Sequence, residues 1–134
     1  MIPIVLASAS PRRKALLEAL GIPIEVFPSG AHELENGEPE SVAIHNAELK
    51  RDDIARRLGR PALVIAADTI VVLGQRILNK PRDLNDARDM LRELSGKTHI
   101  VITGVGIANT QTGQKTSGIE STEVTFRTLT NDQI

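Results

Sequence analysis

The sequence predicts an α/β fold, in which short apolar strands alternate with helices. Ile2–Leu6 and Ala62–Ala67 are short apolar runs of the kind found in strands, and the second is continuous enough for a central strand that is buried on both faces. Between them, Pro39–Leu58 carries small and apolar residues at helical spacing. The second half of the chain adds further β segments, which we expect over residues 100–105 and 116–126.

The composition limits the kinds of protein this can be. A chain of 134 residues suits one domain with one core, and 40% apolar and 25% charged residues are ordinary for a globular protein. The aromatic residues are two Phe, so we expect an aliphatic core and no stacking of nucleic-acid bases on aromatic side chains. The absence of Cys excludes disulfides, thiolate metal sites and Cys nucleophiles.

Charge and hydropathy limit the partners. A net charge of −1 argues against a nucleic-acid polymer, so any phosphate binding must come from a local cluster of cations. The longest apolar runs are too short to cross a bilayer, and the first residues lack the pattern of a signal peptide. We therefore expect a cytoplasmic protein without a membrane partner.

A loop of small residues follows the first strand and leads into a helix. Pro11 falls at the first helical position, and Gly21 stands where the helix would end. Basic residues in a first helical turn oppose the helix dipole, and a bound phosphate would explain them, because N–H, hydroxyl and guanidinium groups all bind phosphate. A capped surface helix with its basic residues in solvent explains the pattern equally well. The candidate phosphate ligands are Ser8, Ser10, Arg12 and Arg13, and the apolar stripe of the helix is Ala15, Leu16, Ala19 and Leu20.

The long helix predicted from Pro39 to Leu58 ends at Gly59 and places a lysine on its inner face. An inward lysine must either extend to solvent or find an anion, and a nearby phosphate site favours the anion. Its inward row is Ala43, Ala47, Lys50, Ile54 and Leu58, with Arg51, Asp52, Arg56 and Arg60 more outward. The segment before this helix is acidic, and one or two of its carboxylates could hold a hard cation against substrate phosphates, although the pattern does not say which. Its carboxylates are Glu33, Glu35, Glu38 and Glu40.

Asp68 is the most informative single acid in the chain. It interrupts two apolar runs, Ala62–Ala67 and Ile70–Leu73, and an ionised carboxylate there is costly unless it is paired, hydrogen-bonded or metal-bound. Strand ends are where α/β folds place ligands, which favours a functional role over a simple turn. Gly74-Gln75 predicts a hairpin, which would place Lys80 at a strand end near Asp68.

The remaining segments add structural predictions. Asn85 is the expected N-cap of a helix that ends near Gly96, with Ala87, Met90, Leu91 and Leu94 as its stripe. Gly104 and Gly106 permit close approach of another backbone. Residues 130–133 form a capping box, a helix-start signal followed by one residue, so we expect a single domain over residues 1–134 that lacks its C-terminal segment. His32, His45 and His99 show no metal-ligand spacing.

The ordered set of motifs resembles the Maf family, the septum-formation-inhibitor-like nucleoside triphosphate pyrophosphatases. The resemblance covers essentially the whole chain, and each motif alone is weak while the ordered set is specific. The matching stretches are L-A-S-A-S-P-R-R-K-A-L-L from Leu6, the Glu33 region, Lys50 in N-A-E-L-K, Ala67-Asp68-Thr69, Lys80-Pro81, L-R-E-L-S-G-K-T-H at residues 91–99, and Thr103-Gly104-Val105. Asn79 stands where the family usually has Gly.

This resemblance implies a mixed α/β fold with an elongated twisted sheet, flanking helices and a central cleft. It implies cleavage between the α and β phosphates of a nucleoside triphosphate with a divalent cation, Mg²⁺ or Mn²⁺, and it is compatible with a homodimer. Asp68 would be the general base. Arg12 and Thr69 match the branch that acts on dTTP and UTP rather than on 7-methyl-GTP. The implied phosphate or substrate contacts are Ser8, Arg12, Arg13, Lys50, Thr69 and Lys80, and the implied metal ligands are Glu33 and Asp68.

The chemistry of the residues suits this reading. Triphosphate hydrolysis needs positive groups where negative charge shifts in the transition state, and it needs no covalent nucleophile. Two other functions stay open at this stage. One is a non-catalytic nucleotide-binding regulator of cell division, inactive through truncation, and the other is a general phosphatase, which would release orthophosphate first.

Overall fold

The computed structural model describes residues 2–8 and 10–134. Ala9, in the middle of the predicted phosphate loop, lies outside the described residues, as does Met1. The described elements are, in chain order, β1 (Ile4–Leu6), α1 (Pro11–Glu18), β2 (Ile24–Val26), α2 (Pro39–Leu58), β3 (Leu63–Leu73), β4 (Arg76–Leu78), α3 (Leu84–Leu94), β5 (Thr98–Asn109) and β6 (Lys115–Thr125).

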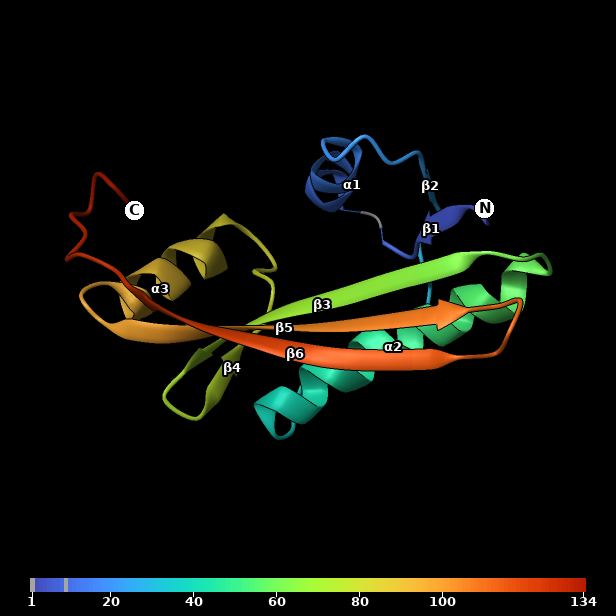
Figure 1. Cartoon of the computed structure of the whole chain (residues 1–134). Coiled ribbons are helices and arrows are strands. Elements are labelled where there is room, and N and C mark those ends of the chain that lie inside the picture. The colour runs from blue at the N-terminus through green and yellow to red at the C-terminus, as the bar shows by residue number, and fades with distance from the viewer. Residues whose placement is uncertain (1, 9) are drawn as a thin grey trace.

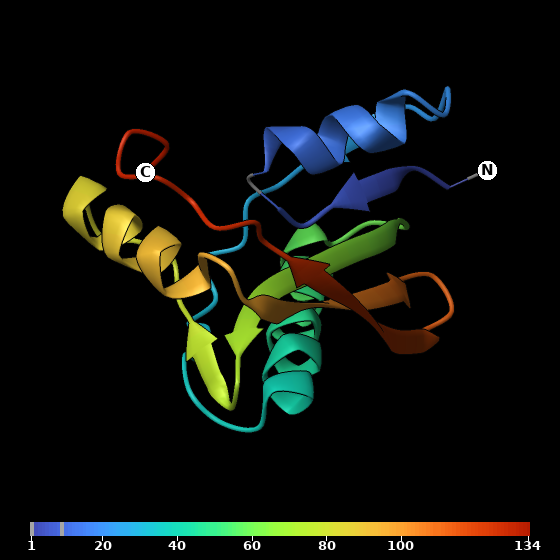
Figure 2. The ribbon, with the colours of Figure 1, turned by 90° about the vertical axis from the view of Figure 1, so that its left-hand side faces the viewer.

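The strands form one mixed, twisted sheet. Its order is β2-β1-β3-β5-β6, and β4 pairs with β3 beyond the end of β1. β2, β1 and β3 run parallel, whereas β3, β5 and β6 are antiparallel, and so are β3 and β4. Helices α1 and α2 lie on opposite faces of this sheet, and α3 lies at the β4 end (Figures 1 and 2). The predicted mixed α/β fold is confirmed.

β3 is the central strand, and it differs from the prediction in one respect. The expected break at Asp68 is wrong, because β3 runs without interruption from Leu63 to Leu73 and pairs Asp68 with Gly104 of β5. What stops near Asp68 is the neighbouring strand. The last β1–β3 partners are Leu6 and Ile65, so one edge of β3 is free from there until β4 pairs with it at Val71. Asp68 therefore lies beside a strand end, although not at the end of its own strand.

Helix α2 begins and ends where the pattern predicts. Pro39 is its first residue, and Gly59 ends it in the left-handed conformation at φ 62°, which glycine adopts without strain. Its inner face contains the expected small residues, but Arg51 is also buried, which corrects the prediction that it faces outward. Arg51 is accommodated because its guanidinium donates to the Thr116 carbonyl at 3.1 Å and pairs with Asp52 at 2.9 Å. The buried residues of α2 are Val42, Ala43, Asn46, Ala47, Arg51 and Ile54.

The predicted close approach at Gly104 sets how near α2 comes to the sheet. A Cβ atom at this position would lie 2.4 Å from the Ala43 carbonyl oxygen, a distance that real Cβ atoms do not reach. Glycine thus lets the helix backbone rest on β5 directly opposite Asp68. As a result, side chains of the next turn of α2 can reach the middle of β3.

The two shorter helices, α1 and α3, differ from their predicted patterns, α1 in how much of it is buried and α3 in its N-cap. Ser10 caps α1 as predicted, accepting from the Arg13 N–H at 3.4 Å, but α1 ends at Glu18 and no residue of it is buried. Its apolar stripe is exposed, because the helix lies over the narrow β1–β2 edge of the sheet (Figure 1). Helix α3 is capped by Asp83, not by Asn85, since the Asp83 carboxylate accepts the Asp86 N–H at 2.8 Å.

The core is aliphatic, as the composition predicts. One cluster joins α2 to the parallel part of the sheet through Val5, Ile54 and Val64, and a second contains Ala43, Val72 and Ile102. Near the last described residue, Thr130 and Gln133 make the reciprocal side-chain bonds of the predicted capping box. Within the described part of the chain, no helix is both long and apolar enough to span a bilayer.

Candidate active site

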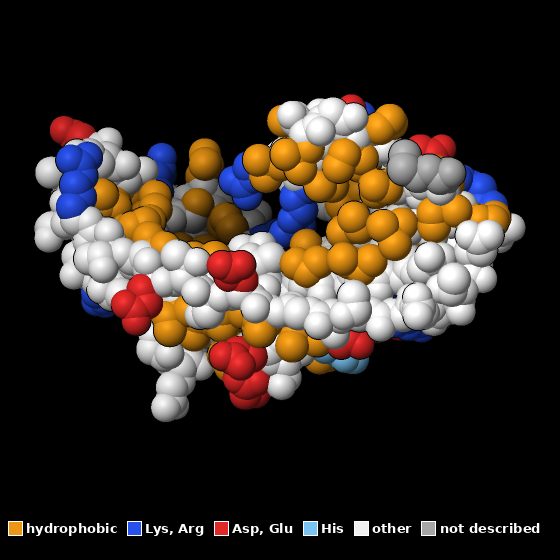
Figure 3. Space-filling model, viewed as in Figure 1, with side chains coloured by type: hydrophobic (Ala, Val, Ile, Leu, Met, Phe, Trp, Pro, Cys, Tyr) orange, Lys and Arg blue, Asp and Glu red, His pale blue; other side chains and the backbone are white. Residues whose placement is uncertain are grey.

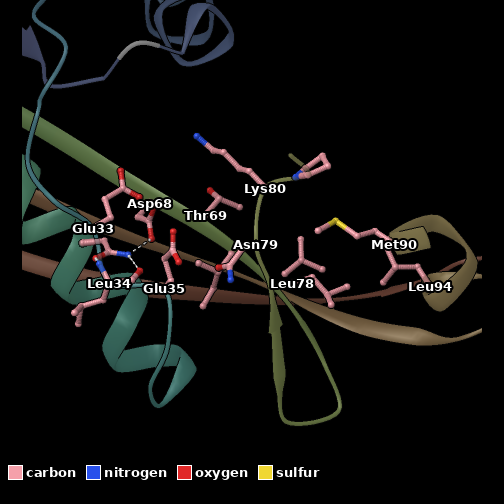
Figure 4. A pocket seen from close by; sticks show the side chains of 14 residues that line it. Glu33, Leu34, Glu35, Asp68, Thr69, Leu78, Asn79, Lys80, Met90 and Leu94 are labelled. Atoms are coloured by element: carbon pink, nitrogen blue, oxygen red, sulfur yellow. Dashed lines mark hydrogen bonds between the residues drawn. The ribbon is translucent and has the colours of Figure 1, made fainter. Parts of the chain in front are cut away.

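A cavity of about 400 Å³ lies where β1 has ended and β4 begins to cover β3. This volume is in the range of small-ligand sites. In the space-filling view, basic side chains line the hollow between the α1 part and the α3 part of the molecule (Figure 3). One end of the cavity is polar, with Glu33, Asp68, Thr69 and Lys80, and the other end is apolar, with Leu78, Met90 and Leu94 (Figure 4).

Asp68 is held at this cavity by donors from α2. Its Oδ1 accepts from Lys50 Nζ at 3.3 Å, and its Oδ2 accepts from Asn46 Nδ2 at 3.1 Å. Asp68 is 7% exposed, and an ionised carboxylate so buried needs such donors. These two contacts occupy different oxygens and therefore fix the plane of the carboxylate.

Lys50 joins the acidic segment to the central strand. Its ammonium lies 3.0 Å from Glu33 Oε1 and 3.3 Å from Asp68 Oδ1, and it donates to the Ala67 carbonyl at 3.2 Å. The prediction of an inward lysine is confirmed. In this structure its anions are the two carboxylates of the protein, which are brought together around a single ammonium group.

The Ala67 carbonyl is available because β1 has stopped. The Ile65 carbonyl still accepts the Ala7 N–H at 2.8 Å, and the Ala67 carbonyl two residues on points to the same side. It accepts from Lys50 on the α2 face and from Arg13 Nη1, at 3.4 Å, on the α1 face. Arg13 also donates to Thr69 Oγ1 at 2.9 Å, and Thr69 shares a 3.0 Å hydrogen bond with Thr103. Both helices therefore converge on one free strand edge.

The structure brings together six of the eight predicted site residues. Glu33, Asp68, Thr69 and Lys80 line the cavity, Lys50 contacts the first two, and Arg13 contacts Thr69. Arg12 is exposed on the first turn of α1 and does not line the cavity. Ser8 is buried, and its hydroxyl accepts the Ser10 N–H at 3.1 Å, so it shapes the loop before α1.

Sequence reasoning missed Asn46 and Thr103 as parts of this site. Asn46 lies one turn before Lys50 on the inner face of α2, and a polar side chain among Ala43 and Ala47 is the same kind of signal that marked Lys50. Thr103 could not be found this way, because its relevance depends on the register that pairs it with Thr69.

The donor set of the site fits a hard divalent cation. Mg²⁺ takes oxygen ligands and is commonly bound by one or two carboxylates together with substrate phosphates. The carboxylates of Glu33 and Asp68 converge on one ammonium, and Glu35 lines the same cavity. In residues 2–8 and 10–134, no group of three or more His, Cys, Asp or Glu side chains is close enough to form a cage from protein ligands alone.

Comparisons with known proteins identify the family. The family model described as "Maf-like protein" matches residues 3–134. The chain belongs to the Maf-like family. This confirms the family resemblance noted in the sequence.

Individual relatives in sequence are named as dTTP/UTP pyrophosphatases. The dTTP/UTP pyrophosphatase of Desulforamulus reducens is 43% identical over 135 residues, covering 100% of this chain and 71% of the relative. The dTTP/UTP pyrophosphatase of Syntrophotalea carbinolica is 46% identical over 136 residues, covering 98% of this chain and 61% of the relative. The chain thus spans roughly two thirds of the length of these curated relatives.

Solved structures with low sequence identity share the fold. The nucleoside-triphosphatase/dITP/XTP pyrophosphatase of Mycobacterium abscessus superposes with a TM-score of 0.58 at 15% identity, covering 92% of this chain and 74% of the other. A HAM1 protein from Coxiella burnetii gives a TM-score of 0.59 at 20% identity, covering 92% and 72%. These similarities support the architecture of the sheet and its helices.

Proposed function

We propose that this Maf-like chain hydrolyses dTTP and UTP to the nucleoside monophosphate and pyrophosphate. The observation that carries the proposal is the convergence of Asp68, Glu33 and Lys50 at the polar end of the cavity. The substrate class is supported by the names of the relatives, which are dTTP/UTP pyrophosphatases.

In this proposal Asp68 is the general base. Its side chain accepts hydrogen bonds from Lys50 and Asn46, which suits an ionised carboxylate with a fixed orientation. A water molecule attacks the triphosphate while Asp68 removes its proton, the bond between the α and β phosphates breaks, and pyrophosphate leaves. General base catalysis of this kind contributes about 10²- to 10⁴-fold to rate.

The basic side chains neutralise the triphosphate. Lys80 lines the cavity, Arg13 lies at the Thr69 end of the free strand edge, and Lys50 lies between the two carboxylates. Positive groups fixed before the substrate arrives stabilise the charge that moves onto the leaving pyrophosphate. Arg12, exposed on α1, is proposed to contact the nucleotide from outside the cavity.

Glu33 and Asp68 are the side chains that would hold a divalent cation, Mg²⁺ or Mn²⁺. When bound, such a cation supplies charge neutralisation for the phosphates and lowers the pKa of a coordinated water. The apolar end of the cavity, with Leu78, Met90 and Leu94, is where the base of the nucleotide would lie. The homodimer and the cytoplasmic location stay predictions from the sequence.

A product assay tests the proposed function. The chain is incubated with Mg²⁺ or Mn²⁺ and a panel of nucleotides that includes dTTP, UTP, dITP and 7-methyl-GTP, and pyrophosphate and orthophosphate are measured separately. We expect pyrophosphate as the first product, with dTTP and UTP as the best substrates. Orthophosphate as the first product would indicate a general phosphatase, and saturable nucleotide binding without any product would indicate a nucleotide-binding regulator.

A further inference from the structure

The segment between β2 and α2 carries Glu33 to the site, yet it has little apolar packing of its own. Among residues 27–38 none is buried, and the Leu34 side chain is 46% exposed. No residue of this segment therefore belongs to either cluster of the hydrophobic core. Its position depends on polar contacts with α2.

Asn46 provides the most enclosed of these contacts. Its Oδ1 accepts the Leu34 N–H at 2.8 Å, and its Nδ2 donates to the Leu34 carbonyl at 3.0 Å, so one side chain satisfies both main-chain groups of the residue after Glu33. The same Nδ2 donates to Asp68 Oδ2 at 3.1 Å. The orientation of the amide is determined by its partners, because two acceptors lie on one side and one donor on the other.

These contacts close a ring around the site. Asp68 is bonded to Asn46, Asn46 to Leu34, and the neighbouring Glu33 to Lys50, which returns to Asp68. The torsion that sets the plane of an aspartate carboxylate has broad minima, so two donors on its two oxygens are what fix it. The ring therefore sets the relative position of the two carboxylates.

The hydrogen bonds that Lys50 and Asn46 make to Asp68 should respond differently to substrate binding. Lys50 is a proposed phosphate contact, so its ammonium is shared between the carboxylates and the incoming anion. Asn46 also lines the cavity, but it is neutral and 2% exposed, and its amide is already bonded to Leu34 and Asp68. Its contacts can persist through the reaction.

We propose that Asn46 is a positioning residue, which holds the Glu33–Leu34 segment and the Asp68 carboxylate in register with one another. The proposal rests on the function proposed above for Asp68. In that function Asn46 contacts no phosphate. Replacing Asn46 should therefore reduce turnover and leave nucleotide affinity nearly unchanged.

The test uses Asn46→Leu, which keeps the branched shape with four heavy side-chain atoms but removes all three hydrogen bonds, and Asn46→Ser, which is smaller and offers one hydroxyl in place of the amide. Ile54→Ala is the matched control, because Ile54 is a buried residue of the same helix in the cluster away from the cavity. We expect kcat for pyrophosphate release to fall by about tenfold or more in Asn46→Leu and less in Asn46→Ser, with KM within about threefold, since small misplacement of reacting groups costs rate steeply. In Ile54→Ala, kcat should stay near wild type despite a lower thermal midpoint.

A double-mutant cycle and hydrogen exchange make the test specific. In an Asp68→Asn background, Asn46→Leu should cost much less than tenfold in kcat, because Asn46 acts through Asp68. Exchange of the Leu34 amide should accelerate in Asn46→Leu and remain slow in Ile54→Ala. If Asn46→Leu and Ile54→Ala lose kcat in proportion to their thermal midpoints, or if Leu34 exchange does not change, the proposal is overturned.

The same experiment separates this proposal from the proposed function. A wild-type chain that releases no pyrophosphate would remove the function, and Leu34 exchange alone would then decide whether Asn46 holds the segment. Should Asn46→Leu fail to fold, Asn46→Ser carries both measurements.

Discussion

At the scale of single residues, the unusual feature is a charged group in the middle of a central strand. Asp68 is tolerated there because Lys50 and Asn46 supply donors to both of its oxygens. The same donors give the carboxylate a defined direction, which a general base requires. The contacts that make a buried carboxylate at Asp68 tolerable are therefore the same contacts that orient it for its proposed role as general base.

Replacing Lys50 tests whether it is a phosphate contact as well as a structural bridge between Glu33 and Asp68. In Lys50→Met the side chain keeps its length but loses its charge, so the proposed phosphate contact and the bridge from Glu33 to Asp68 are both removed. Hydrogen bonds to charged groups contribute about 1.5–3 kcal/mol, so we expect KM for the triphosphate to rise about 10- to 100-fold. Steady-state kinetics and a thermal melt measure this. A lower melting temperature with unchanged KM would mean that Lys50 is structural only.

At the scale of elements, α2 determines what can reach β3. It lies close to the sheet because Gly104 has no side chain, and this brings Asn46 and Lys50 to the free edge of β3. α1 reaches the same edge from the other face through Arg13. The candidate active site is thus the part of β3 that lies beyond the end of β1 and that side chains of α1 and α2 reach.

The Gly104 contact gives a sharp test of this geometry. In Gly104→Ala the new methyl group would meet the Ala43 carbonyl, so the helix must move outward. Overpacking of this kind costs about 1–3 kcal/mol, and we expect activity to fall as well. Gly118→Ala is the control, because a Cβ at Gly118 meets nothing within 4 Å. Equal stability of the two variants in urea unfolding would contradict the close approach.

Local pattern predicts some of these elements better than others. Helix α2 could be predicted to the residue, because Pro39 and Gly59 mark its ends and its inner face is periodic. β3 could not, since nothing in the pattern around Asp68 shows that the strand continues while β1 stops at Leu6. For α1 the pattern predicted more burial than the structure has. Periodicity identifies the apolar face of a helix, but it does not show whether the sheet beneath that face is wide enough to bury it.

At the scale of the whole molecule, the acidic segment between β2 and α2 is attached to α2 by polar contacts, one of which is the Glu33–Lys50 ion pair. Asn46 holds Leu34, and the Ser29 hydroxyl donates to Asp53 Oδ2 at 2.8 Å. That hydrogen bond, together with Arg57, holds the pKa of Asp53 below its ordinary value. The convergence of residues 33, 50 and 68 is a property of this tertiary arrangement, and the family resemblance, not local pattern, is what predicted it.

The Ser29 contact predicts a pH-dependent contribution to stability. Because the folded pKa of Asp53 lies below its unfolded value, the contribution is present above pH of about 4 and is lost as pH falls through the folded pKa. Ser29→Ala should therefore lower the free energy of unfolding by about 0.5–1.5 kcal/mol at pH 7 and by less at pH 3. Urea unfolding at both pH values measures it, and an equal loss at both would show that the bond does not depend on ionised Asp53.

In the proposed reaction, Asp68 removes the proton from the attacking water at a site to which α1 and α2 both contribute side chains. The most direct test of this step is the kinetics of Asp68→Asn with dTTP and UTP, measured as pyrophosphate release. We expect kcat to fall by about 10²-fold or more while KM changes only a few-fold, as for loss of a general base. Wild-type kcat in Asp68→Asn, or a large rise in KM with kcat unchanged, would contradict it.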